Sequence, residues 1–99
     1  MKSGKIPEVL KEKRKEILRI AASHGGQNIQ VFGSLVRGEA GPESDVDILI
    51  DLAPDRTLLD IVAIKQDLED LLGRQVDVVT EAAISPYIRE HVLEEAVSL

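Results

Sequence analysis

Residues 31–52, VFGSLVRGEAGPESDVDILIDL, carry the strongest structural signal in the chain. A short apolar run ends at Gly33 and Ser34, and after ten more residues Asp45 and Asp47 stand on either side of a valine. The segment that follows is strongly apolar, which is typical of a buried strand. Because strand side chains alternate between faces, both aspartates point to one side and the valine and isoleucines point to the other.

A third carboxylate lies in a later strand-like segment, QVDVVT (residues 75–80), where Asp77 faces away from two valines. If this strand neighbours the strand at 46–52, three carboxylates converge on one face. Like charges at a partly dry site repel each other, and a hard divalent cation such as Mg²⁺ removes that conflict. The aspartates are therefore predicted to bind metal beside a phosphate-bearing substrate. The alternative is that each one faces solvent, as most aspartates do.

The glycine–serine pair fits the same interpretation. Gly33 at a strand-to-helix turn lets the backbone approach an anion closely, and Ser34 adds a hydroxyl group. Taken alone, such a pair is usually no more than a turn. Arg37, one helical turn later, has two interpretations that stay open: a phosphate ligand, or a structural ion pair with an aspartate of the acidic cluster.

The remaining pattern predicts helices at residues 6–24, 34–40, 53–73 and 85–96, and strands at 28–32, 46–52 and 75–80. Thr57 and Asp60 resemble a capping box, Gly73 a helix C-cap, and Ser85 a further N-cap. The expected apolar face of the third helix consists of Leu58, Ile61, Leu68, Leu71 and Leu72, and that of the last helix of Ile88, Val92, Leu93 and Ala96. The order α-β-α-β-α-β-α predicts an α/β (α+β) fold, a small mixed sheet with helices packed on it.

Composition narrows the class of protein. The 99 residues suit one domain, 1–99, and the absence of cysteine and of any long apolar stretch favours a cytoplasmic protein without a membrane segment. A net charge of −6 argues against direct nucleic-acid binding. Seven of the twelve basic residues fall within 2–19, as a solvated helix face or a docking helix. The acidic pair Glu94–Glu95 is interpreted as solvated helix charge.

The spacing Gly33-Ser34, ten residues, Asp45-Val46-Asp47, with a later Asp77, resembles the signature of the DNA polymerase β-like nucleotidyltransferase superfamily. FGSLVRGEAGPESDVDILI and the ending IREHVLEEAVSL are similar to the minimal nucleotidyltransferases (MNT) of prokaryotes. This resemblance extends over nearly the whole chain from residue 28.

The resemblance implies a nucleotidyltransferase fold and transfer of a nucleoside monophosphate from a nucleoside triphosphate to a hydroxyl group. Asp45 and Asp47 would hold two Mg²⁺ ions and the triphosphate, and Asp77 would bind the ion that activates the attacking hydroxyl. Gly33 and Ser34 would hold the outgoing phosphates of ATP.

The resemblance also implies a partner, because this length leaves no room for an acceptor-binding domain. Similar chains are antitoxins of HEPN–MNT pairs, which transfer AMP to a tyrosine of a HEPN ribonuclease toxin and form a hetero-oligomer with it. Two alternatives stay open: an antitoxin that acts by binding alone, and a nucleotidyltransferase for a small molecule such as an aminoglycoside.

Overall fold

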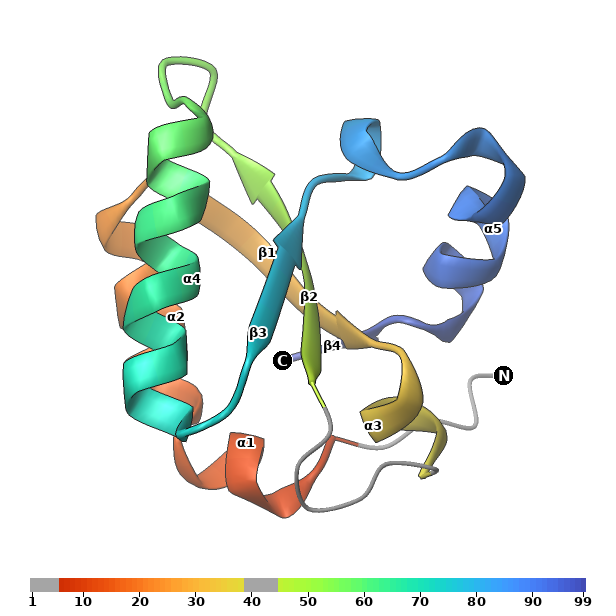
Figure 1. Cartoon of the computed structure of the whole chain (residues 1–99), viewed down its shortest axis with the longest axis horizontal. Coiled ribbons are helices and arrows are strands. Elements are labelled where there is room, and N and C mark those ends of the chain that lie inside the picture. Colours follow the sequence, from red (N-terminus) through yellow and green to blue (C-terminus); the bar gives the residue numbers. More distant parts are fainter. Residues whose placement is uncertain (1–5, 39–44) are drawn as a thin grey trace.

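The computed structural model describes residues 6–38 and 45–99. Helices cover both faces of a central sheet (Figure 1). The strands are β1 (Gly26–Phe32), β2 (Val46–Leu52), β3 (Val76–Val79) and β4 (Val97–Ser98). The helices are α1 (Glu8–Glu12), α2 (Arg14–Ser23), α3 (Ser34–Arg37), α4 (Leu58–Leu72), the 3₁₀ helix η1 (Glu81–Ala83) and α5 (Pro86–Glu95). None of the helices in these two ranges is both long and apolar enough to cross a membrane.

The sheet is mixed, with the strand order β3-β2-β1-β4. β1 runs antiparallel to both β2 and β4, whereas β2 and β3 are parallel and are connected through α4. The predicted mixed sheet and the three predicted strands are confirmed. β4 was not predicted, because two residues at the end of the chain are too few to show a strand pattern.

The main core lies between the sheet and the helices α1, α2 and α4. Val46, Ile48 and Ile50 of β2 are at most 1% exposed and point into it. Ile64 and Leu68 of α4 are equally buried against the same cluster. The central strand thus supplies the apolar face that the alternation of its sequence predicts.

A second, smaller core lies on the opposite face of the sheet, under α5. Among the described residues, its buried members are Leu49, Ile84, Val92 and Ala96. Figure 1 shows α5 on the side of the sheet away from α2 and α4. One end of the aspartate-bearing face is therefore covered by a helix, which the sequence pattern of β2 alone did not indicate.

Several helix predictions need correction. The helix predicted at 53–73 begins only at Leu58, because the Thr57 side chain caps it there. The helix predicted at 6–24 is two helices separated at Lys13, in a run of six charged residues (11–16) that offers no apolar side chain to hold this turn against the core. Leu58 is 81% exposed, beside an open hollow that it lines together with Val78, so it is not part of the α4 core face. Ile88 is 52% exposed, since α5 packs on the sheet through its later turns. The helix predicted at 34–40 is a single turn, Ser34–Arg37, ended by Gly38. Residues 39–40 of that prediction and the predicted loop at 41–44 lie outside the described residues.

The predicted capping box of α4 is confirmed. The Leu59 N–H donates to Thr57 Oγ1 (3.2 Å), and the Thr57 N–H donates to Asp60 Oδ2 (3.1 Å). Gly73 ends the helix with φ +67°, a conformation that glycine adopts without strain.

Replacing the capping threonine should destabilise the protein. We expect Thr57→Ala to cost about 1 kcal/mol, because one backbone donor at the helix start loses its acceptor. For a chain of this size that lowers the melting temperature by roughly 4–8 °C. Thr80→Ala is the matched control, since Thr80 precedes η1 without a side-chain cap. Equal losses in the two variants would contradict the capping role; calorimetry measures both.

Candidate active site

The three predicted carboxylates lie on one face of the sheet. Asp47 of β2 and Asp77 of β3 are register partners on adjacent parallel strands, and Asp45 comes directly before β2. Asp47 is half-buried, whereas Asp45 and Asp77 are exposed. The arrangement is therefore an open carboxylate cluster on the side of the sheet that α5 only partly covers.

Burial raises the pKa of the Asp47 carboxyl above its ordinary value. Repulsion from Asp77 and Asp45 raises it further, a smaller contribution comes from Glu95, and the nearby Arg37 guanidinium opposes the rise. The charged form of Asp47 is thus penalised in the folded protein. A bound cation would relieve this penalty.

Gly33 lies against the Asp47 carboxylate. Phe32 is the register partner of Asp47, so the next residue of the chain begins the turn into α3 beside that side chain. Gly33 has φ +84°, and a Cβ at this position would collide with Asp47 Oδ2. Only glycine satisfies both constraints, which places the Gly33-Ser34 turn at the carboxylate cluster.

Arg37 lies at the end of the single turn of α3 and forms an ion pair with Glu95, the last residue of α5. Arg37 Nη1 donates to Glu95 Oε1 at 2.6 Å, and the Gly33 N–H donates to Glu95 Oε2 at 3.1 Å. The structure shows an ion pair for Arg37, as one of the two interpretations expects. Its partner, however, is Glu95 of the last helix.

The interpretation of Glu95 as solvated charge is therefore wrong. Its side chain is only 11% exposed and belongs to the site, whereas the neighbouring Glu94 is exposed. A sequence signal for this was present. Glu95 lies three residues after the buried Val92 and one before the buried Ala96, which places it on the inward flank of the helix.

The donor set of this face fits Mg²⁺ bound at an open site. In the two described ranges no three His, Cys, Asp or Glu side chains are grouped closely enough to hold a metal ion by themselves. Mg²⁺ does not need three protein ligands, because it usually binds through one or two carboxylates and completes its shell with waters and substrate phosphates. Asp47 and Asp77, in register on neighbouring strands, provide such a pair.

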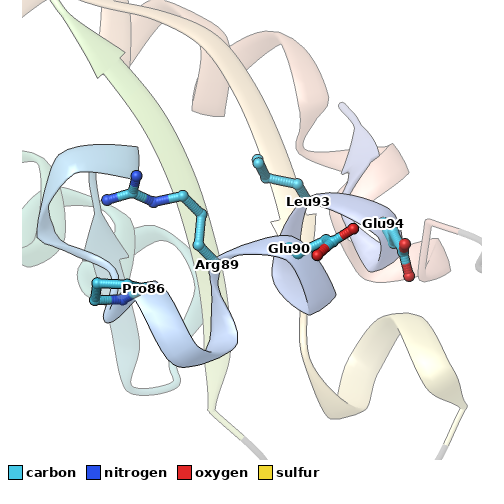
Figure 2. A pocket seen from close by; sticks show the side chains of 5 residues that line it. All are labelled: Pro86, Arg89, Glu90, Leu93 and Glu94. Carbon is cyan, nitrogen blue, oxygen red and sulfur yellow. The ribbon is translucent and has the colours of Figure 1, made fainter.

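A separate hollow of about 400 Å³ borders the start of α4 and the end of β3, and Arg56, Thr57 and Thr80 line it with apolar neighbours. Another, of about 430 Å³, runs along one stripe of α5 (Figure 2). Its lining consists of Pro86, Arg89, Glu90, Leu93 and Glu94. Neither hollow includes an aspartate of the carboxylate cluster.

Comparison with known proteins agrees with this geometry. The nucleotidyltransferase domain family matches residues 7–99. The chain belongs to this family. A solved structure described as "Structure of putative minimal nucleotidyltransferase" shares 46% identity with this nucleotidyltransferase, with a TM-score of 0.83 and coverage of 93% of this chain and 94% of the other. The predicted nucleotidyltransferase fold is confirmed.

Relatives of this nucleotidyltransferase carry more specific names. "Protein adenylyltransferase MntA" of Thermococcus cleftensis is 40% identical over 93% of this chain and 90% of its own length. "Putative protein adenylyltransferase MJ0435" of Methanocaldococcus jannaschii is 38% identical over 91% of this chain and 97% of its own length. A structure described as a toxin–antitoxin with AMP-PNP is 23% identical, with a TM-score of 0.72 and coverage of 85% of this chain and 69% of the other, and shares the fold.

The raised pKa of Asp47 makes a testable statement about stability. Since the folded-state pKa exceeds the unfolded value, ionisation of Asp47 costs stability as the pH rises above about 4. Without divalent cations, Asp47→Asn should therefore melt higher than the wild type at pH 7, and the difference should shrink towards pH 4. Because Asp47 is partly exposed, we expect only about 2–4 °C.

Asp70→Asn is the control for this prediction, because Asp70 is an exposed carboxylate on α4, across the sheet from the cluster. It removes one negative charge without touching the site. An Asp47→Asn protein that melts below the wild type at pH 7, or no higher than Asp70→Asn, would contradict the penalty that burial and neighbouring carboxylates place on ionised Asp47.

Proposed function

We propose that this nucleotidyltransferase transfers AMP from Mg-ATP to a tyrosine hydroxyl of a HEPN ribonuclease toxin and thereby neutralises it. The observation that carries the proposal is the similarity to proteins named protein adenylyltransferase, at 38–40% identity over at least nine-tenths of both chains. The residues of the site are compatible with this reaction, because a carboxylate cluster and a glycine–serine turn meet on one face.

The turn after β1 is proposed to hold the outer phosphates of ATP. Ser34 supplies a hydroxyl group and Arg37 a guanidinium whose side chain is 41% exposed, so both are within reach of a ligand. Asp45 and Asp47 would hold two Mg²⁺ ions, which when bound neutralise the developing charge on the phosphates. The contact between Gly33 and Asp47 keeps the phosphate side and the carboxylate side of the site together.

The acceptor is proposed to arrive from the open side of the cluster. Asp77 lies on the edge strand β3, exposed beside Asp47 of β2. Its carboxylate would help to hold the ion next to the acceptor and would accept the proton of the tyrosine hydroxyl. The tyrosine oxygen then forms a bond to the α-phosphorus while the bond to the bridging oxygen breaks, and pyrophosphate leaves. Positioning supplies much of the rate in phosphoryl-type transfer, so a protein partner that presents the tyrosine is an integral part of the proposal.

Metal and nucleotide should stabilise the protein jointly. Mg²⁺ with ATP should raise the melting temperature more than the sum of the two separate effects, because each ligand lowers the repulsion that the other meets at the same face. Differential scanning fluorimetry with all four combinations measures this. Identical melting curves in every condition would contradict a metal–nucleotide site at the cluster.

Transfer to the toxin should depend on the aspartates. Incubated with the cognate toxin and Mg-ATP, the wild type should add adenylyl groups (AMP less water) to a toxin tyrosine, detected by intact-mass spectrometry. Asp45→Asn and Asp47→Asn should lose at least about a hundredfold in rate, as expected when the groups that hold a catalytic metal are removed. Ser34→Ala should lose less, because backbone donors remain, and Asp70→Asn should match the wild type.

The same assay separates the alternatives. A toxin that is inhibited without any mass change would support an antitoxin that acts by binding alone. An unaffected toxin, together with a modified small hydroxylated compound, would support a small-molecule nucleotidyltransferase. Retention of transfer by either aspartate variant would contradict the assigned roles.

A further inference from the structure

Glu95 joins two parts of the nucleotide site that lie far from it in the sequence. Each oxygen of its carboxylate accepts from a different donor: Oε2 from the backbone N–H of Gly33 and Oε1 from Nη1 of Arg37. The two donors are the first residue of the β1–α3 turn and the last residue of α3. A single side chain therefore spans the whole glycine–serine turn.

We propose that Glu95 is a positioning residue that holds the β1–α3 turn and the Arg37 guanidinium in the arrangement that receives the outer phosphates of ATP. This inference rests on the proposed binding of ATP at the same site. Glu95 acts through Gly33 and Arg37 and does not itself touch the substrate. The likeness to other nucleotidyltransferases says nothing of such a role.

The alternative is that the Glu95 carboxylate occupies the phosphate position in the absence of ATP and must leave when ATP binds. The fixed position of the backbone argues against this. The Ala96 N–H donates to the Val92 carbonyl (2.8 Å), Ala96 is fully buried, and Val97 pairs with Val31 of β1. With both sides of Glu95 tethered and its side chain 11% exposed, the carboxylate has little room to move aside.

The Arg37 guanidinium is also accessible to a ligand while it is paired with Glu95 through Nη1. The Arg37 side chain is 41% exposed, so the group fixed by Glu95 is still accessible from solvent. Fixing a flexible arginine before the ligand arrives removes part of the ordering cost of binding.

The role predicts a selective defect. Glu95→Gln keeps the size of the side chain but loses the charge that holds Arg37, so the outer phosphates should be bound less well. We expect affinity for Mg-ATP to fall about tenfold, the size expected for loss of a charge-assisted hydrogen bond. Affinity for AMP, which lacks the outer phosphates, should change less than twofold, well below the loss of such a bond. A general loss of structure would affect both ligands alike.

Titrations followed by ¹H–¹⁵N NMR measure both affinities on one protein. The two bonds from Glu95 to Gly33 and Arg37 are called the brace below. The Gly33 amide signal reports on it directly, because in Glu95→Gln the Gly33 N–H loses its carboxylate acceptor, which changes the amide proton shift even without ligand. Glu94→Gln is the matched control: it removes one charge from the exposed neighbour and should leave the Gly33 signal and both affinities at wild-type values. Glu95→Asp keeps the charge but is one methylene shorter, and should show an intermediate loss for ATP alone.

Each outcome decides the matter. Tighter ATP binding by Glu95→Gln would show that the carboxylate competes with phosphate, and would overturn the brace. Equal losses for ATP and AMP, or no loss for either, would also overturn it. A wild-type protein that binds Mg-ATP no more tightly than AMP would also overturn the brace. If the wild type binds neither ligand, the proposed function fails first and the brace fails with it. Should Glu95→Gln not fold, Glu95→Asp provides the same comparison.

Discussion

The strict alternation of β2 is the constraint on which the rest of the structure depends. This strand lies inside the sheet, and one of its faces is apolar while the other carries carboxylates. Val46, Ile48 and Ile50 fill the main core, while Asp47 stands on the other face among charges that disfavour its ionisation. A slip of one residue would exchange the two faces, burying a carboxylate and exposing the core. The burial of the apolar face therefore fixes the position of the carboxylates.

Much of this could be predicted from sequence because it is encoded locally. Alternation within seven residues gave the β2 strand, and spacing within four residues gave the capping box at Thr57. The same alternation in two strands predicts that Asp47 and Asp77 share a face if the strands are neighbours, and their pairing in register comes from the structure. The resemblance to the nucleotidyltransferase superfamily rests on a similarly local pattern, the glycine–serine turn and the aspartate pair.

The parts that could not be predicted depend on contacts between distant segments. Glu95 lies 62 residues from Gly33, and nothing near it in the sequence indicates that its partner is the β1–α3 turn. Leu49 is buried because α5 folds back over the aspartate face, and Leu58 is exposed because a hollow separates it from the sheet. In each case the residue type allows both environments, and only the packing of another element decides between them.

The two cores of the protein differ greatly in size, and this has a consequence for its motions. Within residues 6–38 and 45–99, thirteen buried residues make up the main core, whereas four make up the core under α5. Regions with few buried apolar contacts open locally at lower free energy than the rest of the molecule, so amide hydrogens of α5 should exchange with solvent sooner than those of β2. Since Glu95 belongs to this layer, every local opening of α5 also releases Gly33 and Arg37. The turn proposed to bind phosphate thus keeps its two bonds to Glu95 only during the fraction of time for which α5 is docked.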